Sequence, residues 1–336
     1  MARADRCSMT SSSSSSSAAA AAAANPLLDA DTLAAYTSAC QGVSGPKAHP
    51  RGKQVLDSLM KHLHAFINEV ELTNAEWLAA CELLNRSGKM SDEKRDEMIL
   101  ISDILGVESL VDTLSHERAL KQTGTASSTD GAEESSKATV SAILGPFYRE
   151  NAPEYPMGAD IVLDHSIKSQ DGNKGLTCYL YGTVTSAKTG RPIDNARIDV
   201  WHTGPNGFYE QQDPDQPDYN YRGRFNTAAD GRYSFRCLVP TAYPIPYDGG
   251  AGDILKLLDR SPMRPAHIHF LIDAPGHKQL VTQIFDRQCK YLGADAVFAD
   301  KSDLTVDFVE PRTQEAKDFG VDRQLCFDIR LVPDEK

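Results

Sequence analysis

The sequence lacks the features that mark several special classes of protein. Its seven cysteines contain no C-x-x-C pair and are odd in number, so neither a disulfide framework nor a cysteine zinc site is expected. No apolar run reaches the roughly 18 residues that cross a bilayer. Positive charge is also scarce, because 35 basic and 47 acidic residues give a net charge of −12. An acidic chain is a poor partner for nucleic acid or an anionic membrane. We therefore expect a cytoplasmic protein with reduced thiols.

The composition is otherwise that of a globular protein. The chain has 336 residues, of which 40% are hydrophobic and 24% charged, enough for one large domain or two modest ones. The beginning of the chain differs, because a serine run is followed directly by an alanine run. Such low-complexity sequence predicts that residues 1–25 form a disordered leader.

Residues 26–120 have the pattern of a helical domain. Apolar residues recur at helical spacing on one face of the segment 54–67, and they are Val55, Leu56, Leu59, Leu63, Phe66 and Ile67. Thr73 and Glu76 form a capping box that opens a further helix, and Ser91 is the predicted start of the next. The segment 121–138 is rich in Ser, Thr, Gly and acidic residues, which is typical of a linker.

From residue 139 to residue 336 the pattern changes to short strands and turns. Strands are predicted at 176–185, 197–202, 233–239, 266–272, 280–285 and 325–332. Most of them are not separated by helices, which indicates a β-sandwich rather than a parallel α/β sheet. The predicted fold class is therefore α+β, with an N-terminal helical domain followed by a β-sandwich domain.

Two histidines on one predicted strand are the first candidates for a metal site. In Arg264-Pro-Ala-His-Ile-His269, alternation places Ile268 on one face of the strand and both His267 and His269 on the other. Two imidazoles on one face can converge on a metal ion. The H-x-H pattern alone also fits two histidines on a polar sheet face, and further ligands must come from elsewhere. Since acidic residues are plentiful, a site with two histidines and one carboxylate remains open.

Two tyrosines occupy turns near predicted strand ends. Tyr209 follows a glycine-containing turn, and Tyr243 follows a strand end and is flanked by Pro244 and Pro246. Each tyrosine taken alone is typical of a packed aromatic side chain. Three further tyrosines nearby, Tyr219, Tyr221 and Tyr247, are competing candidates.

Taken together and in order, these segments resemble a known enzyme family. The segments W-H-x(5)-F-Y ending at Tyr209, P-x-x-Y-P-I-P around Tyr243, and R-P-A-H-I-H ending at His269 are similar to those of the intradiol ring-cleavage dioxygenases. Residues 143–148, I-L-G-P-F-Y, resemble the segment that opens the catalytic domain of that family. The resemblance extends from about residue 40 to residue 310.

The resemblance implies a set of site residues. One iron(III) ion is expected to be bound by Tyr209, Tyr243, His267 and His269, with Tyr243 leaving the metal when the substrate arrives and accepting one of its protons. Arg264 and Gln283 match residues that face the substrate ring. Substrate contacts are expected from Ile143, Gly145, Pro146, Phe147, Ala296 and Val297.

The resemblance also indicates a substrate and an assembly. Sequence around Tyr243–Gly249 and Asp295–Phe298 is more similar to the hydroxyquinol branch than to the catechol branch. The expected reaction uses O2 to open hydroxyquinol (1,2,4-trihydroxybenzene) between its adjacent hydroxylated carbons, giving 3-hydroxy-cis,cis-muconate, a tautomer of maleylacetate. Cleavage of catechol to cis,cis-muconate is the alternative, and both activities in one enzyme remain open. The family further implies a homodimer formed through the N-terminal helices.

Two other classes of function remain open on the residues alone. A zinc hydrolase that uses the H-x-H pair predicts a colourless protein with no need for Tyr209. A β-sandwich binding module joined to a helical dimerisation domain predicts ligand binding that survives removal of iron.

Overall fold

The computed structural model describes residues 27–124 and 137–334, and it divides into two compact units, Met1–Cys81 and Glu82–Lys336. The predicted leader at 1–25 lies outside the described residues, as does most of the predicted linker. The division between the units falls inside helix α3 (Asn74–Met90), well before the predicted end of the helical domain at residue 120. The reason is that α4 (Glu97–Ile104) packs with the sheet-rich part of the chain. None of the described helices has the length and apolarity needed to cross a bilayer.

The first unit contains two long helices, α1 (Ala30–Gly42) and α2 (Pro50–Glu69). They are joined by a hydrogen bond of 3.0 Å between Thr37 Oγ1 and His64 Nδ1. The predicted apolar face of α2 is present, but its side chains are about half exposed, with Leu59 at 56% and Phe66 at 47%. This unit therefore presents an apolar helix face that its own residues leave uncovered.

The helices that follow begin at capping side chains. Thr73 and Glu76 form the predicted capping box at the start of α3, with Thr73 N donating to Glu76 Oε2 at 2.9 Å. Helix α4 (Glu97–Ile104) begins later than the predicted start at Ser91, because the Asp96 carboxylate caps it by accepting the N–H groups of Met98 and Ile99. Helix α5 (Val107–Thr123) completes the helical segment.

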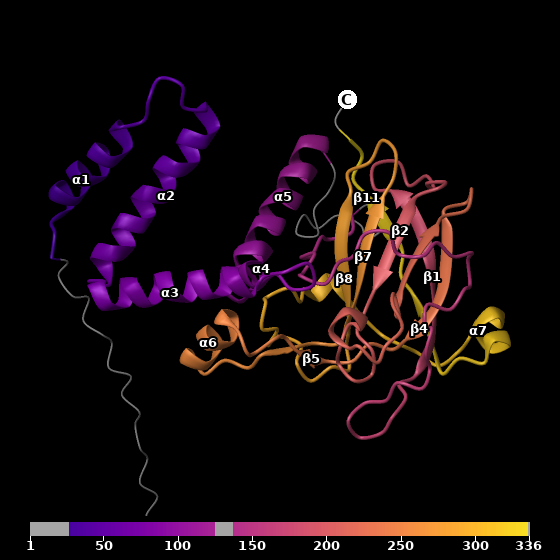
Figure 1. Ribbon diagram of the computed structural model, residues 1–336. Helices are drawn as coiled ribbons and strands as arrows, with labels where there is room; N and C mark the ends of the chain where they lie inside the picture. Colours follow the sequence, from indigo (N-terminus) through magenta and orange to yellow (C-terminus); the bar gives the residue numbers. More distant parts are fainter. Residues whose placement is uncertain (1–26, 125–136, 335–336) are drawn as a thin grey trace, which may run out of the picture. The chain divides into compact units, whose positions relative to one another are not determined.

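The second unit is built around two sheets (Figure 1). In the first, β1 (Thr177–Ser186) pairs with β4 (Arg232–Leu238), β10 (Arg323–Cys326) and β11 (Ile329–Leu331). The second has the order β3-β2-β7-β8-β9, and its members are β3 (Arg222–Asn226), β2 (Arg197–Trp201), β7 (His267–Asp273), β8 (Leu280–Asp286) and β9 (Thr305–Val306). A separate hairpin pairs β5 (Tyr243–Pro244) with β6 (Met263–Arg264).

The two larger sheets share one apolar core, as a β-sandwich requires. It contains Leu180 and Phe235 from the first sheet and Ile198, Ile268 and Phe270 from the second, all with no measurable exposure. A second apolar cluster lies on the other face of β7. It combines α4 residues such as Leu100 and Ile104 with Trp201, Phe285 and the tyrosines of the candidate site.

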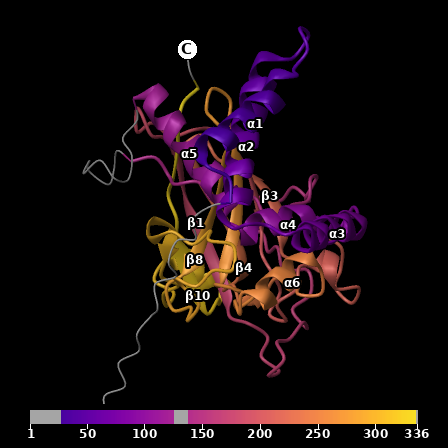
Figure 2. The same ribbon diagram turned by 90° about the vertical axis from the view of Figure 1, so that its left-hand side faces the viewer.

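Short elements that the sequence pattern did not predict complete the unit. Helix α6 (Gly250–Leu257) lies beside α4 in both views (Figures 1 and 2), and Ala251 N donates to Glu97 Oε1 at 2.9 Å. Helix α7 (Gln314–Phe319) precedes β10, and the 3₁₀ turns Glu210–Gln212 and Ser302–Leu304 lie in loops. The predicted strand 325–332 is divided into β10 and β11, because Asp328 turns its carboxylate toward the backbone N–H of Thr183 at 2.9 Å.

Candidate functional site

Strand β7 presents His267 and His269 on the face opposite the sandwich core. Ile268 and Phe270 point into that core, so the predicted alternation is confirmed. The two imidazole Nε2 atoms lie 3.1 Å apart, and both residues are 2% exposed. Across the antiparallel pair with β8, His269 is directly opposite Gln283. The register of the sheet thus brings three predicted site residues together.

Both histidines are held as neutral rings. Burial lowers the pKa of His267 well below its usual range, and the positive charge of Arg264 lowers it further. Burial also lowers the pKa of His269, with His267 as the next cause. His267 Nδ1 lies 2.7 Å from the carbonyl oxygen of Pro265, which can only accept, so Nδ1 carries the proton. His267 Nε2 therefore presents a lone pair to the site, as metal binding requires.

The two tyrosines come from separate segments, Tyr209 from the turn before Glu210–Gln212 and Tyr243 from β5, and they meet at their phenol oxygens. Tyr209 Oη and Tyr243 Oη lie 3.4 Å apart, with exposures of 0% and 3%. The turn before Tyr209 needs glycine at position 207, because φ is +82° and a Cβ there would lie 3.3 Å from Tyr243 Cβ. Burial raises the pKa of Tyr209 well above its usual value, and the neighbouring Tyr243 adds to this effect. The Tyr209 phenol thus needs a nearby cation in order to ionise.

The four rings surround a common point. Ring centroids are 5.6 Å apart for Tyr209 and Tyr243, 5.5 Å for Tyr243 and His267, 4.8 Å for His267 and His269, and 6.3 Å for His269 and Tyr209. The two imidazole Nε2 atoms are 3.1 Å apart, and the two phenol oxygens are 3.4 Å apart. Two atoms that bind the same metal ion, each at about 2.1 Å, have a similar separation from each other. Two phenol oxygens and two imidazole nitrogens form a donor set that fits a hard, highly charged ion such as iron(III).

The competing ligand sets lie elsewhere. Within residues 27–124 and 137–334, no group of three His, Cys, Asp or Glu side chains is placed to hold a metal ion, which argues against a carboxylate-containing site. Tyr221 Oη donates to the carbonyl of Asp164, and Tyr219 lies under the Arg149 guanidinium at 4.1 Å from the ring centre. Tyr247 is 37% exposed and lies under the Lys256 ammonium.

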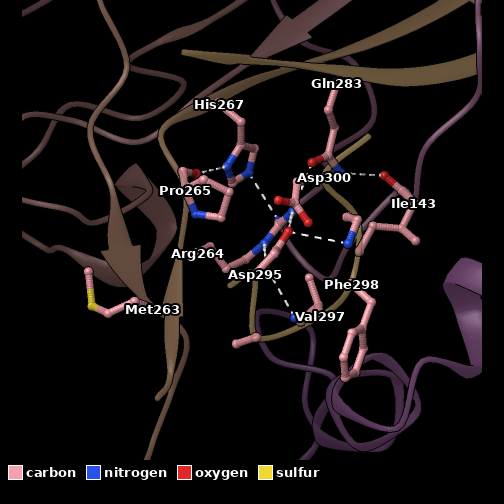
Figure 3. Close-up of polar contacts among 12 residues, drawn as sticks. Ile143, Met263, Arg264, Pro265, His267, Gln283, Asp295, Val297, Phe298 and Asp300 are labelled. Carbon is pink, nitrogen blue, oxygen red and sulfur yellow. Dashed lines mark hydrogen bonds and ion pairs between the residues drawn. The ribbon is translucent and has the colours of Figure 1, made fainter. Parts of the chain in front are cut away.

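Arg264 connects His267 to the rest of the site (Figure 3). Its Nη1 donates to His267 Nε2 at 3.0 Å, and its Nη2 donates to Gln283 Oε1 at 2.8 Å. Gln283 in turn donates to the carbonyl of Ile143 at 2.7 Å. Burial acts to lower the pKa of Arg264, but the Asp295 carboxylate outweighs it and raises that pKa, so the guanidinium stays charged. The hairpin register also places Tyr243 directly opposite Arg264.

The predicted substrate contacts border this group. The Phe147 ring stacks on Tyr209 at 4.6 Å between centroids, and a side chain at Gly145 would lie 3.5 Å from His269 Cε1. Between them Pro146 is half-buried. Ile143, Ala296 and Val297 are each 2% exposed and belong to the same apolar cluster as the two tyrosines.

Sequence reasoning missed a buried arginine behind Tyr209. Arg222 is 1% exposed and donates to Glu210 Oε2 at 2.7 Å, to the carbonyl of Phe147 at 2.7 Å and to Gln211 Oε1 at 2.9 Å. Its guanidinium also lies 5.6 Å from the centre of the Tyr209 ring. One side chain thus fixes the segment that carries Tyr209 and the segment that carries Phe147. No pattern in the sequence around Arg222 marks this role.

The helical segment contributes a buried acidic pair that was also missed. Asp103 is 1% exposed, no backbone or basic donor of the described residues reaches its carboxyl oxygens, and its carboxyl group meets that of Glu108. Glu108 Oε1 accepts the N–H of Leu144 at 3.0 Å. Burial, together with the nearby Glu108 carboxylate, raises the pKa of Asp103 to about 9. Asp103 lies on α4, whose Leu100 and Ile104 belong to the same apolar cluster as Tyr209 and Tyr243.

The chain is similar to known proteins over most of its length. The family model described as "Dioxygenase" matches residues 145–333, and the model described as "Catechol dioxygenase N terminus" matches residues 49–123. The chain is 42% identical to the catechol 1,2-dioxygenase of Candida albicans over 89% of this chain and 92% of that protein. It is 41% identical to the hydroxyquinol 1,2-dioxygenase of Rhizobium sp. over 87% of this chain and 88% of that protein.

A solved structure extends the similarity to the whole fold. The hydroxyquinol 1,2-dioxygenase of Pseudomonas putida superposes with a TM-score of 0.74 at 35% identity, covering 90% of this chain and 99% of that one. The α+β architecture and the enzyme class expected from the sequence are thereby confirmed. The family models, these relatives and the shared fold together show that the chain belongs to the intradiol ring-cleavage dioxygenases.

Proposed function

We propose that the protein binds one iron(III) ion through Tyr209, Tyr243, His267 and His269 and cleaves hydroxyquinol between its adjacent hydroxylated carbons. The carbon–carbon bond breaks, each of the two carbons gains one oxygen atom from O2, and the product is 3-hydroxy-cis,cis-muconate, the tautomer of maleylacetate. The observation that supports this proposal most directly is the convergence of two phenol oxygens, 3.4 Å apart, and two imidazole nitrogens, 3.1 Å apart, in one buried cluster.

The chemistry divides between the ion and the side chains. Iron(III) supplies the positive charge that ionises phenols and accepts electron density from a bound diol, so that O2 can react with the ring. Tyr243 provides the base, because its phenol oxygen can take a proton from the incoming diol. His267 and His269 remain neutral donors throughout, since burial disfavours their protonation.

Arg264 and Gln283 act on the substrate side of the site. When the His267 Nε2 lone pair is engaged by a metal ion, Arg264 Nη1 loses its present acceptor and is free to donate to an anionic substrate oxygen. A fixed guanidinium there stabilises negative charge that develops on the ring during oxygen attack. The Gln283 side chain accepts a hydrogen bond from Arg264 and donates one to the Ile143 carbonyl. It therefore links the Arg264 guanidinium to the segment 143–147.

Hydroxyquinol is preferred over catechol on two grounds. The first is the resemblance of the Tyr243–Gly249 and Asp295–Phe298 segments to the hydroxyquinol branch, together with the fold match to an enzyme of that name at 35% identity. The second is Asp103, a buried acid that can share its proton with Glu108 but has a remaining carboxyl oxygen that no donor of the described residues reaches. A buried polar group of this kind is costly unless a ligand meets it, and a third ring hydroxyl could do so. Catechol is the second candidate, favoured by the 42% identity to the Candida albicans enzyme.

We further propose a homodimer formed through the uncovered apolar face of α2. Residues Leu56, Leu59, Leu63 and Phe66 are 47–56% exposed, and an apolar helix face of this length is usually covered by a partner. Sedimentation of the iron-loaded protein tests this point. A monomer at micromolar concentration would contradict it.

Steady-state kinetics test the substrate. Iron-loaded protein is assayed with hydroxyquinol and with catechol by oxygen uptake, and the products are identified by mass. We expect kcat/KM for hydroxyquinol to exceed that for catechol by at least tenfold. A reversed ratio assigns the enzyme to catechol. Absence of ring opening with either diol contradicts the proposed function as a whole.

A further inference from the structure

Asp295 makes the contacts of an anchor for Arg264. Its Oδ1 accepts Arg264 Nε at 3.1 Å, and its Oδ2 accepts Arg264 Nη2 at 3.2 Å. The Asp295 side chain has no exposure, and that of Arg264 is 3% exposed. Two parallel bonds between a carboxylate and the planar guanidinium fix the plane of the guanidinium as well as its position.

This anchoring determines which Arg264 atom faces the proposed iron site. The Nε and Nη2 groups are engaged by Asp295, and Nη2 is also bonded to Gln283. The remaining nitrogen, Nη1, is thereby directed at His267 Nε2, as Figure 3 shows. A guanidinium without the Asp295 fork could rotate about its side-chain bonds, and Nη1 would lose its fixed direction.

The same carboxylate holds a segment that is expected to contact the substrate. Asp295 Oδ1 also accepts the N–H of Val297 at 3.2 Å, and Oδ2 accepts the N–H of Ala299 at 3.3 Å. Phe298, between them, has a φ of +57°, a conformation that costs free energy for a residue with a side chain. The Asp295 contacts on both sides of Phe298 keep the backbone in this conformation, so Ala296 and Val297 stay beside the tyrosines.

We propose that Asp295 is a positioning residue that directs Arg264 Nη1 into the site and, through the same carboxylate, holds the 296–299 segment against it. The proposal rests on the proposed function, because it assumes that Arg264 stabilises charge on the substrate. Nothing in the proposal requires Asp295 to touch the substrate.

The test is a double-mutant cycle on the iron-loaded enzyme, comparing wild type, Asp295→Asn, Arg264→Gln and the double variant. Substitution of a residue that orients a site residue typically costs roughly 10–100-fold in activity. We therefore expect Asp295→Asn to lower kcat by about that factor while each chain keeps its iron. In the Arg264→Gln background the same substitution should change kcat by less than about threefold, because its effect acts through Arg264.

Asp199→Asn is the matched control. Asp199 is 1% exposed and accepts Arg224 Nε at 3.1 Å, so it is an equally buried carboxylate with an arginine partner at the same distance. It should reduce thermal stability to an extent similar to Asp295→Asn but leave kcat within about twofold of wild type. If Asp295→Asn does not fold, Asp295→Glu replaces it, since the longer side chain keeps the charge but displaces the fork.

Three results would overturn the inference. One is wild-type kcat in Asp295→Asn, and another is an equal loss of kcat from Asp295→Asn with and without Arg264. The third is loss of bound iron from Asp295→Asn, which would place its effect at the metal ligands. Failure of the proposed function is distinguishable from these results, because it appears as wild-type turnover in Arg264→Gln itself or as no ring opening by the wild type.

Discussion

The phenol oxygens of Tyr209 and Tyr243 lie 3.4 Å apart although 34 positions separate the two residues in the chain. Their rings meet edge to face, with an interplanar angle of 89° and a centroid distance of 5.6 Å. Packing alone does not require two buried phenol oxygens to lie against each other. Each hydroxyl could donate to a backbone carbonyl, as the Tyr221 hydroxyl does to that of Asp164. The arrangement is the one that the proposed iron site requires.

The first prediction concerns colour. Phenolate bound to iron(III) absorbs visible light by charge transfer, so the iron-loaded protein should be red-brown. Tyr209→Phe should abolish the band or shift it strongly, and Tyr243→Phe should shift it, because each removes one phenolate. Visible absorption spectra of protein with measured iron content test this. Tyr221→Phe, which removes the hydroxyl of another buried tyrosine outside the cluster, should leave the band in place. A wild-type protein that holds iron but has no visible band would contradict the assignment.

A second prediction follows from the buried Arg222–Glu210 pair. Arg222→Met removes three hydrogen bonds and leaves the Glu210 carboxylate in the interior with one remaining partner, Arg149 at 2.6 Å. Breaking a buried ion pair on one side typically costs about 3–5 kcal/mol, and we expect a loss near the lower end of that range because Arg149 remains. Urea unfolding measures it.

Arg149→Met is the matched control for this pair. Arg149 binds the other oxygen of the same Glu210, but its side chain is 28% exposed, so its removal should cost only about 1 kcal/mol. A double variant, Arg222→Met with Glu210→Gln, should recover part of the stability lost in Arg222→Met, since no buried charge is left unpaired. Equal losses from Arg222→Met and Arg149→Met would contradict the assigned importance of Arg222.

The site residues that the sequence predicts are those whose neighbours are set by local geometry. Side chains alternate between the two faces of a strand, so the sequence alone places His267 and His269 on one face and Ile268 on the other. His269 contacts Gln283 because β7 and β8 form one antiparallel hairpin. The 14-residue spacing between the two residues is therefore enough to predict their contact. The resemblance to a family then placed Tyr209 and Tyr243.

The residues that the sequence does not reveal act over long separations. Arg222 reaches Phe147 across 75 positions, and Glu108 reaches Leu144 across 36 positions from a different kind of element. A charged residue on a strand or helix is usually solvent-exposed, so only the tertiary structure shows that these are buried. The division of the strand predicted at 325–332 has a similar cause, because Asp328 bonds to Thr183 on β1, 145 positions earlier.

The third prediction concerns His202, whose side chain is 1% exposed and whose pKa burial lowers to about 4. The unfolded chain binds a proton near pH 6.5, whereas the folded protein does so only near pH 4. The free energy of unfolding therefore falls as the pH drops from about 6.5 to about 4, by roughly 3 kcal/mol for this group. His202→Asn should remove that part of the decline in urea titrations at pH 7, 6 and 5. An unchanged decline in His202→Asn would refute the argument.

The last prediction has the opposite sign and concerns Asp103. Its folded pKa of about 9 lies above the ordinary value of 3.8, so the folded protein keeps a proton that the unfolded chain releases. The free energy of unfolding contributed by this group therefore falls as the pH rises between those two values, by at most about 1.4 kcal/mol per pH unit. Asp103→Asn cannot titrate, so its stability relative to wild type should increase from pH 5 to pH 8.5.

Glu108 provides an independent check on the same carboxyl group, because its charge is one of the causes that raise the pKa of Asp103. Glu108→Gln should lower that pKa and so weaken the alkaline decline, without abolishing it, since burial is the larger cause. If Asp103→Asn differs from wild type by the same amount at pH 5 and pH 8.5, Asp103 is ionised in the folded protein. Asp103 would then be a carboxylate and not a neutral hydrogen-bond donor. Its negative charge would disfavour the third ring oxygen of hydroxyquinol and so favour catechol.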